Sequence, residues 1–309
     1  MKETPRNLAA SVHARLLNRS RVKGEDFNFN LQRYASERFL FRLGESPHRD
    51  RLVLKGAMLF SLWGGSLYRS TRDLDFTGYG PNNEKQVLAC LAEICNLAVP
   101  DDGMTFDTST LTAEPIREHA EYNGLRIRLT AYLGNARIPM QIDIGFGNAI
   151  EPAPSEVQYP VLLDAASPRI LAYPKEAVVA EKFHALVTLG EATSRTKDLY
   201  DLYVLAGQFD FQGDALARAI RATFERRKTA ITVEPPAALT PQFFADEDRG
   251  RMWNAYRERN TLSGAPQDLQ QVGERLRAFL TAPWVALASA DRVPRHWPQA
   301  GPWKFGAET

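Results

Sequence analysis

Two kinds of hydrophobic periodicity divide this chain, and no other feature of the sequence constrains its fold as strongly. Before residue 150, apolar and polar residues alternate in three segments, as they do in half-buried strands: MTFDTSTL, GLRIRLTAYL and RIPMQIDIGF. Shorter strands are predicted for RLVL and DLDFTG, with a small helix between them. After Pro174 the period is helical, which predicts helices at 175–190, 196–208, 213–229, 241–259 and 268–281. Strands followed by helices indicate an α+β chain.

The order of these segments also predicts two domains. Amphipathic helices are expected in the first half of the chain at NLAASVHARLLNRSR, LQRYASERFLFRL and EKQVLACLAEICNLA. The proline-rich stretches EPAPSEVQYP and ASPRILAYP separate the strand-rich half from the helical half. With 309 residues the chain is long enough for two ordinary domains. We therefore expect N-terminal helices and a sheet over residues 1–165 and a helical domain over residues 166–309.

Composition excludes several classes of protein. The formal charge of +1 excludes a chain that is basic throughout, so any contact with nucleic acid must be regional. The only cysteines, Cys90 and Cys95, lie five residues apart in a predicted helix, a spacing typical of neither a zinc site nor a disulfide scaffold, which favours the cytoplasm. No apolar run reaches the roughly 18–20 residues needed to cross a bilayer, so no membrane is expected as a partner.

Two acids one residue apart stand out in the segment DLDFTG. In a strand, Asp73 and Asp75 share one face, while Leu74 and Phe76 point to the other face and into a core. Two uncompensated carboxylates on one face would repel each other or take up a proton, and a cation removes this conflict. Mg²⁺ prefers one or two carboxylates together with substrate phosphates. The pair therefore predicts a site for Mg²⁺ or Mn²⁺, although Asp-x-Asp also occurs in solvated turns.

A third acid lies on a separate predicted strand. In RIPMQIDIGF the apolar residues fill one face, which leaves Gln141 and Asp143 on the other. Asp143 could therefore join Asp73 and Asp75 in a carboxylate triad that shares metal ions. The alternative is a lone strand acid exposed to solvent.

The helical half carries a lysine on an apolar face. Lys182 lies four residues after Val178 and four before Leu186, so it occupies the buried stripe of its helix. Its ammonium could hold phosphate oxygens, or its long side chain could snorkel to solvent. His184 lies off this stripe and is expected to be an ordinary surface residue or to line a cleft.

The next predicted helix begins with acids. Thr196 is the expected N-cap residue, and Asp198 and Asp201 follow within or just after the first turn. Carboxylates there interact favourably with the helix dipole without any role in catalysis. The pattern leaves capping and catalysis as alternatives.

Taken in order, the segments LKGAMLFSLW, RSTRDLDF, MQIDIGF and EKFHALVTLGEATSRTKDLYDLYVL resemble the AbiEii-type nucleotidyltransferase toxins of type IV abortive-infection systems, which are related to the MenT toxins. The resemblance covers roughly residues 50–205. It implies a polymerase-β-like nucleotidyltransferase core with a mixed sheet, followed by a helical C-terminal domain. It further implies that the catalytic residues are Asp73, Asp75, Lys182 and one helix acid, Asp198 or Asp201.

The resemblance also implies where a nucleoside triphosphate (NTP) binds. Thr71 and Arg72, directly before the acid pair, are expected to contact the nucleotide. For the phosphate-binding glycine loop two candidates stay open: Gly56, after Lys55, by its position, and Gly65 followed by Ser66, by its identity.

Three function classes remain after this reasoning. The resemblance implies a toxin that transfers a nucleotide from an NTP to RNA, most of all to the 3′ end of tRNA, and that has a cognate antitoxin. A nucleotidyltransferase that modifies a small molecule or a protein hydroxyl is the alternative, and a catalytically dead binding module is the third. The residues themselves offer only two RNA-binding candidates: a basic helix end around Arg226, and the tail that interleaves Arg295 with Trp297 and Trp303. A solvated helix and a tail docked on its own domain are the competing interpretations.

Overall fold

A computed structural model describes residues 7–64, 71, 73–117, 123–189, 195–262, 264–289 and 291–305. Contacts between residues group the chain into two units. The first comprises Met1–Gly147 and Ser155–Ala172, and the second comprises Asn148–Pro154 and Tyr173–Thr309. Each unit is described by itself.

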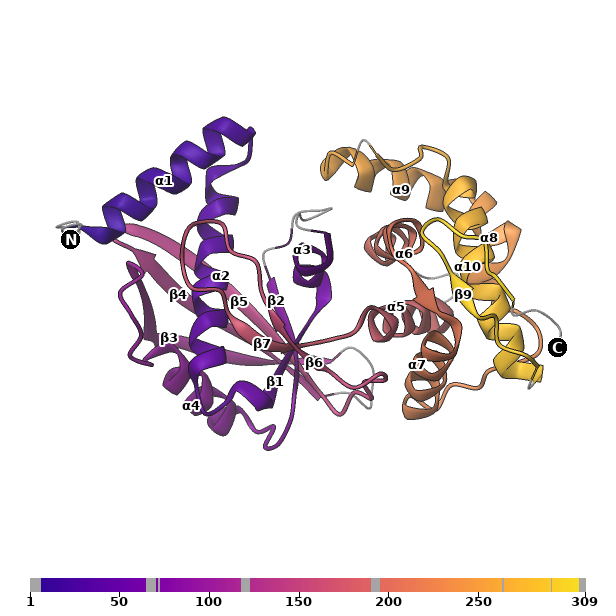
Figure 1. Ribbon diagram of the computed structural model, residues 1–309, viewed down its shortest axis with the longest axis horizontal. Coiled ribbons are helices and arrows are strands. Elements are labelled where there is room, and N and C mark those ends of the chain that lie inside the picture. The colour runs from indigo at the N-terminus through magenta and orange to yellow at the C-terminus, as the bar shows by residue number, and fades with distance from the viewer. Residues whose placement is uncertain are drawn as a thin grey trace. The chain divides into compact units, whose positions relative to one another are not determined.

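The first unit contains a mixed seven-stranded sheet with the strand order β3-β4-β5-β2-β1-β7-β6 (Figure 1). The two pairs β2/β5 and β1/β7 are parallel, and the other neighbours are antiparallel. The pair of acids lies on β2, in the middle of the sheet. The strands are β1 (Leu52–Lys55), β2 (Asp73–Gly78), β3 (Met104–Arg117), β4 (Asn123–Leu133), β5 (Ala136–Phe146), β6 (Ser155–Gln158) and β7 (Arg169–Ala172).

Helix α2 (Phe27–Glu45) forms the core of the first unit with the sheet, and the helices α1 (Leu8–Lys23) and α4 (Glu84–Cys95) lie beside it (Figure 1). The ring of Phe39 on α2 lies 6.4 Å from Phe76 on β2 and 6.2 Å from Phe106 on β3, measured between centroids. Each of the three helices begins at an Asn or Asp whose side chain accepts a backbone N–H of the first turn. Shorter helices are η1 (Arg49–Arg51), η2 (Gly56–Met58) and α3 (Leu59–Gly64).

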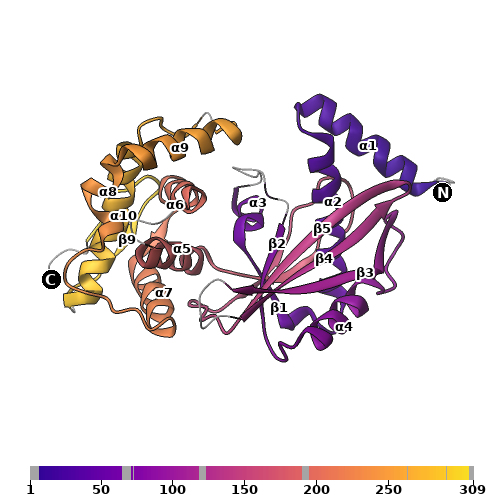
Figure 2. The same cartoon turned by 180° about the vertical axis from the view of Figure 1, so that it is seen from behind.

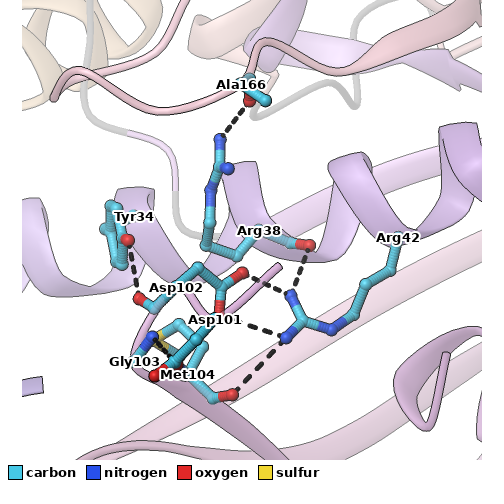
Figure 3. A network of polar contacts seen from close by, with 8 residues as sticks. All are labelled: Tyr34, Arg38, Arg42, Asp101, Asp102, Gly103, Met104 and Ala166. Carbon is cyan, nitrogen blue, oxygen red and sulfur yellow. Dashed lines mark hydrogen bonds and ion pairs between the residues drawn. The ribbon is translucent and has the colours of Figure 1, made fainter. Parts of the chain in front are cut away.

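An arginine network fixes the C-terminal half of α2 to the start of β3 (Figure 3). The guanidinium of Arg42 binds both carboxylate oxygens of Asp102, at 2.7 and 3.1 Å, and also donates to the carbonyls of Arg38 and Met104. Tyr34 donates to the carbonyl of Asp102 at 2.8 Å. The side chains of this charge pair are less than one tenth exposed, and the bonds give partners to both terminal nitrogens of Arg42 and to both carboxylate oxygens of Asp102.

A second buried charge on α2 makes stability depend on pH. Glu37 accepts the backbone N–H of Leu162 at 2.9 Å and pairs with Arg33 at 3.2 Å, yet its burial raises the pKa of this carboxyl from 4.5 to about 7. Between these values the folded chain keeps a proton that the unfolded chain loses, so the free energy of unfolding should fall as pH rises from about 4.5 to about 7. The fall should be roughly 3 kcal/mol, because one pKa unit corresponds to about 1.4 kcal/mol.

Chemical denaturation of the parent chain and of Glu37→Gln across this pH range measures how the free energy of unfolding changes with pH. The difference between the two proteins is the contribution of Glu37. In Glu37→Gln the free energy of unfolding should no longer fall by this roughly 3 kcal/mol as pH rises from about 4.5 to about 7. Glu45→Gln, at an exposed position on the same helix, is the matched control and should keep the parent slope. Identical slopes in all three proteins would show that Glu37 does not titrate with folding.

The second unit is helical (Figure 2). Its core contains packed aromatic rings. Phe183 on α5 lies 5.7 Å from Phe224 on α7 and 5.6 Å from Trp284 on α10, between ring centroids. The predicted helix at 241–259 is in fact two helices, because Asp246 ends the first and caps the second, accepting the N–H of Arg249. The elements are α5 (Lys175–Leu189), α6 (Thr196–Gln208), β8 (Phe211–Gln212), α7 (Gly213–Arg226), η4 (Ala237–Leu239), α8 (Pro241–Ala245), α9 (Glu247–Arg259), α10 (Leu269–Ser289) and β9 (His296–Trp297).

The aromatic tail docks on its own unit. Trp297 donates its indole N–H to the carbonyl of Ala206, and Trp303 donates to that of Phe279, both at 2.8 Å. Trp297 is 1% exposed and Trp303 9%, so neither indole presents a face on which a base could stack. Of the two interpretations of the tail, the docked one is confirmed. Among the described helices, none has the length and apolar character to span a membrane.

Candidate active site

The two acids of β2 lie on one face of the strand, as predicted. Asp73 and Asp75 are half-buried, whereas Leu74 and Phe76 between and after them are 1% and 0% exposed. The alternation of β5 is confirmed as well, since Gln141 and Asp143 are partly exposed and the apolar residues between and around them are buried: Ile138, Met140, Ile142 and Ile144. The carboxylates therefore stand on the polar face of the sheet.

Strand pairing extends this acid pair into a row of charges. Asp75 is the register partner of Lys55 on β1 and of Asp143 on β5, and Asp143 is in turn opposite Arg126 on β4. Glu114 on β3 is opposite Arg126 and ends the row. Residues directly opposite each other on neighbouring strands project from the same face, with the strands about 4.8 Å apart. One carboxylate of the predicted triad, Asp143, is thus beside Asp75.

Arg126 binds Asp143 through a two-pronged ion pair. Its Nε donates to Oδ1 at 2.9 Å and its Nη2 donates to Oδ2 at 2.7 Å, and Gln141 adds a longer bond of 3.4 Å to Oδ2. These bonds to Asp143 raise the pKa of Arg126, and the negative charge of Asp73 adds to the effect. Sequence reasoning missed Arg126, although the alternation of GLRIRLTAYL places it on the polar face.

A glycine turn lies against the second acid. Gly56 has a φ of +72°, in the left-handed region, and a Cβ on it would lie 2.8 Å from both Cβ and Cγ of Asp75. Only glycine avoids both the strained backbone and this overlap. Of the two candidate glycine loops, this one is therefore adjacent to the acids, whereas Gly65 and Ser66 lie outside the described residues, as does Arg72.

Gly56→Ala should lower the free energy of unfolding by about 1–3 kcal/mol, the cost of a non-glycine residue in a sparsely populated backbone region. It should also displace the side chain of Asp75. Urea denaturation measures the first effect. Gly250→Ala in α9 is the matched control: an added Cβ there meets nothing within 4 Å, and the exchange should stabilise the helix by about 0.5–1 kcal/mol. Equal effects at the two glycines would remove the argument for a tight turn.

The acid pair fits a divalent cation bound together with phosphates. Within the described ranges, no group of three His, Cys, Asp or Glu side chains comes together as a metal cluster. Mg²⁺ does not need one, because one or two carboxylates plus substrate phosphates suffice. Asp73 and Asp75 supply two partly exposed carboxylates from one strand. Thr71, two residues before the first residue of β2, is half-buried.

In the second unit, the predicted lysine and both predicted acids form one cluster. The ammonium of Lys182 lies 2.9 Å from Asp198 and 2.7 Å from Asp201, and Arg195 lies 3.4 Å from the other oxygen of Asp198. The side chains are 13%, 6% and 1% exposed for Lys182, Asp198 and Asp201. Snorkelling to solvent, one of the two interpretations of Lys182, is wrong because its charge is held inside the unit.

The capping prediction for Thr196 is wrong, and so is the surface interpretation of His184. Thr196 does not cap α6: the N-cap position is Arg195, without a side-chain cap bond, and Asp198 binds cations. His184 is not a surface residue, because α6 and α7 pack on α5 and leave it 3% exposed. Its Nδ1 accepts a hydrogen bond from Arg227, so its Nε2 carries the proton and donates to Thr229 at 2.8 Å.

Two crystal structures are similar to this chain. One is a Helicobacter pylori protein described as a candidate nucleotidyltransferase, with 14% identity, a TM-score of 0.45 and coverage of 94% of this chain and 99% of that one. The other is JHP933 from Helicobacter pylori, with 15% identity, a TM-score of 0.44 and coverage of 81% and 89%. Among curated proteins, no sequence matches.

The sequence itself matches a family model. Residues 38–281 match the model described as "Nucleotidyl transferase AbiEii toxin, Type IV TA system". The match includes the strand with Asp73 and Asp75 and the helices with Lys182 and Asp198, and it extends over well more than half of the 309 residues. The chain therefore belongs to the AbiEii nucleotidyltransferase toxins of type IV toxin–antitoxin systems.

Proposed function

We propose that this enzyme is a metal-dependent nucleotidyltransferase that moves a nucleotide from an NTP to an RNA acceptor, most specifically the 3′ end of tRNA. The observation that carries the proposal is the pair of partly exposed carboxylates on β2, Asp73 and Asp75, in a chain of this family. A polymerase-β-like core and action in the cytoplasm, where tRNA is found, are parts of the same proposal. A toxin of this family also implies an antitoxin as its partner.

Each group of the first unit has a role in this chemistry. Asp73 and Asp75 would hold Mg²⁺ or Mn²⁺, which when bound neutralises the charge that develops on the α-phosphate. Lys55 lies opposite Asp75 and its ammonium can bind phosphate oxygens. The hydroxyl of Thr71 and the backbone at Gly56 are proposed to contact the triphosphate, as are Gly65, Ser66 and Arg72 outside the described residues.

The second unit contributes further proposed catalytic groups. The ammonium of Lys182 would stabilise the leaving pyrophosphate, and the carboxylate of Asp198 would orient the attacking hydroxyl. Asp198 is the better candidate of the two helix acids, because the side chain of Asp201 is 1% exposed and that of Asp198 is 6% exposed.

Transfer of labelled nucleotide tests the proposal. The purified chain is incubated with Mg²⁺, each of the four α-³²P-labelled NTPs and total tRNA, and the RNA is separated from protein on a denaturing gel. Label on tRNA, which forms far more slowly with Asp73→Asn, is the expected result. Parallel incubations with a protein extract and with hydroxyl-bearing small molecules test whether the chain labels a protein or a small molecule instead. Label that appears there and not on RNA would overturn the RNA acceptor while leaving the transferase chemistry in place.

A further inference from the structure

The third strand acid of the site is already occupied by a cation. Both carboxylate oxygens of Asp143 accept bonds from the guanidinium of Arg126, at 2.9 and 2.7 Å, and Gln141 makes a third contact. Charge-assisted, two-pronged bonds of this kind are among the strongest that a carboxylate makes. A metal ion could bind Asp143 only by displacing this guanidinium.

The position of Arg126 is also unfavourable for a second metal ion. Arg126 lies opposite Asp143, which lies opposite Asp75, so the guanidinium is two strands away from the acid pair on the same face. The negative charge of Asp73, on the same strand as Asp75, also raises the pKa of Arg126, so the guanidinium and this carboxylate attract each other. Two-metal sites place their ions about 3.5–4 Å apart, and a permanent positive charge bound to Asp143, on the same face as the pair, opposes a second dication between Asp143 and Asp75.

We propose that Arg126 takes the place of a second metal ion, so that each chain binds one divalent ion, on Asp73 and Asp75, and that Asp143 is a positioning residue for Arg126. This inference rests on the proposed function. Asp143, expected from the sequence to be a metal ligand, instead fixes the orientation of the guanidinium. Two of the five N–H donors of Arg126 bind Asp143. The guanidinium plane can direct its other donors to phosphate oxygens of the nucleotide.

Native mass spectrometry of the full chain counts the bound ions directly. The samples contain MnCl₂ and each of the four α,β-imido NTP analogues, which cannot be cleaved at the α-phosphate. The parent chain should carry one Mn²⁺ per bound analogue. Arg126→Gln, which frees Asp143, should carry two. Arg128→Gln is the matched control, because Arg128 lies two residues along the same strand and pairs with Glu114, and it should keep one.

Asp143→Asn gives a second, independent test. Unlike Arg126→Gln, it does not require a second metal ion to bind at Asp143. The inference expects one ion in this variant, as in the parent chain. Two ions in the parent and one in Asp143→Asn would overturn the inference and leave the proposed transferase intact. If a folded Arg126→Gln variant binds only one ion, the inference that Arg126 takes the place of a second metal ion is wrong. No ion and no analogue on the parent chain would overturn the proposed function, and this inference with it.

Discussion

Replacing Asp73 or Asp75 with Asn should lower the rate of nucleotide transfer by about a hundredfold to a thousandfold, the typical loss for one preorganised charge-stabilising group. The melting temperature should stay level or rise. Asn keeps the shape of the side chain and removes one of two like charges on the same face of β2, so repulsion in the folded chain is relieved. Function and stability should therefore move in different directions, as they do at sites that are strained for activity.

Initial transfer rates, thermal melts and growth of expressing cells measure these effects together. Asp50→Asn is a suitable control, because it removes a negative charge from an exposed side chain of the same unit and should change neither rate nor growth. If Asp73→Asn still arrests growth, or if it is inactive only because it is unfolded, Asp73 does not hold the catalytic metal.

Lys182→Ala should destabilise the second unit by about 3–5 kcal/mol, the usual cost of removing one partner from a buried ion pair. On the sequence alone, the apolar stripe of α5 predicts a small cost for this change. The structure reverses that expectation: without the ammonium, Asp198 and Asp201 would be left as neighbouring carboxylates that are 6% and 1% exposed. Urea denaturation of the parent chain and the variant measures the loss.

Two further variants give this prediction its controls. Lys197→Ala removes a lysine from an exposed position of α6 and should change the free energy of unfolding by no more than about 0.5 kcal/mol. The triple variant Lys182→Met, Asp198→Asn, Asp201→Asn removes all three charges and should recover much of the lost stability. If Lys182→Ala were as stable as the parent chain, the ion pairs of Lys182 would contribute nothing to the fold.

The sequence predicts the long elements of the fold and the short strands β1 and β2, but it does not predict the short strands β6 and β7. The alternation in β4 and β5 and the helical period of α5 and α6 extend over ten residues or more, so each pattern repeats often enough to be distinctive. Strands β6 and β7 have four residues each and lie in the proline-rich stretch that separates the two periodicities. Since β7 pairs with β1, the contacts place Ser155–Ala172 in the first unit, past the boundary expected at residue 165.

For the candidate site, the sequence predicts which face a residue lies on but not its partner. The period of two places Asp73, Asp75 and Asp143 on polar faces, and the structure agrees. The pairing of Asp143 with Arg126 depends on the register between β4 and β5, which is set by the whole hairpin. Likewise, the period of the helix places Lys182 on a buried face, but its ion pairs require α6 to pack beside α5.

The docked tail has a consequence for how the protein is made. Strand β9 pairs with β8, and Trp297 and Trp303 fill the core against helices that precede them by tens of residues. A ribosome adds about 5–20 residues each second, and N-terminal domains fold first. The sheet unit can therefore fold during translation, while the unit that carries Lys182 lacks part of its core until Trp303 has been released. A prematurely terminated copy that lacks Trp297 and Trp303 should therefore have a second unit whose core is incompletely packed.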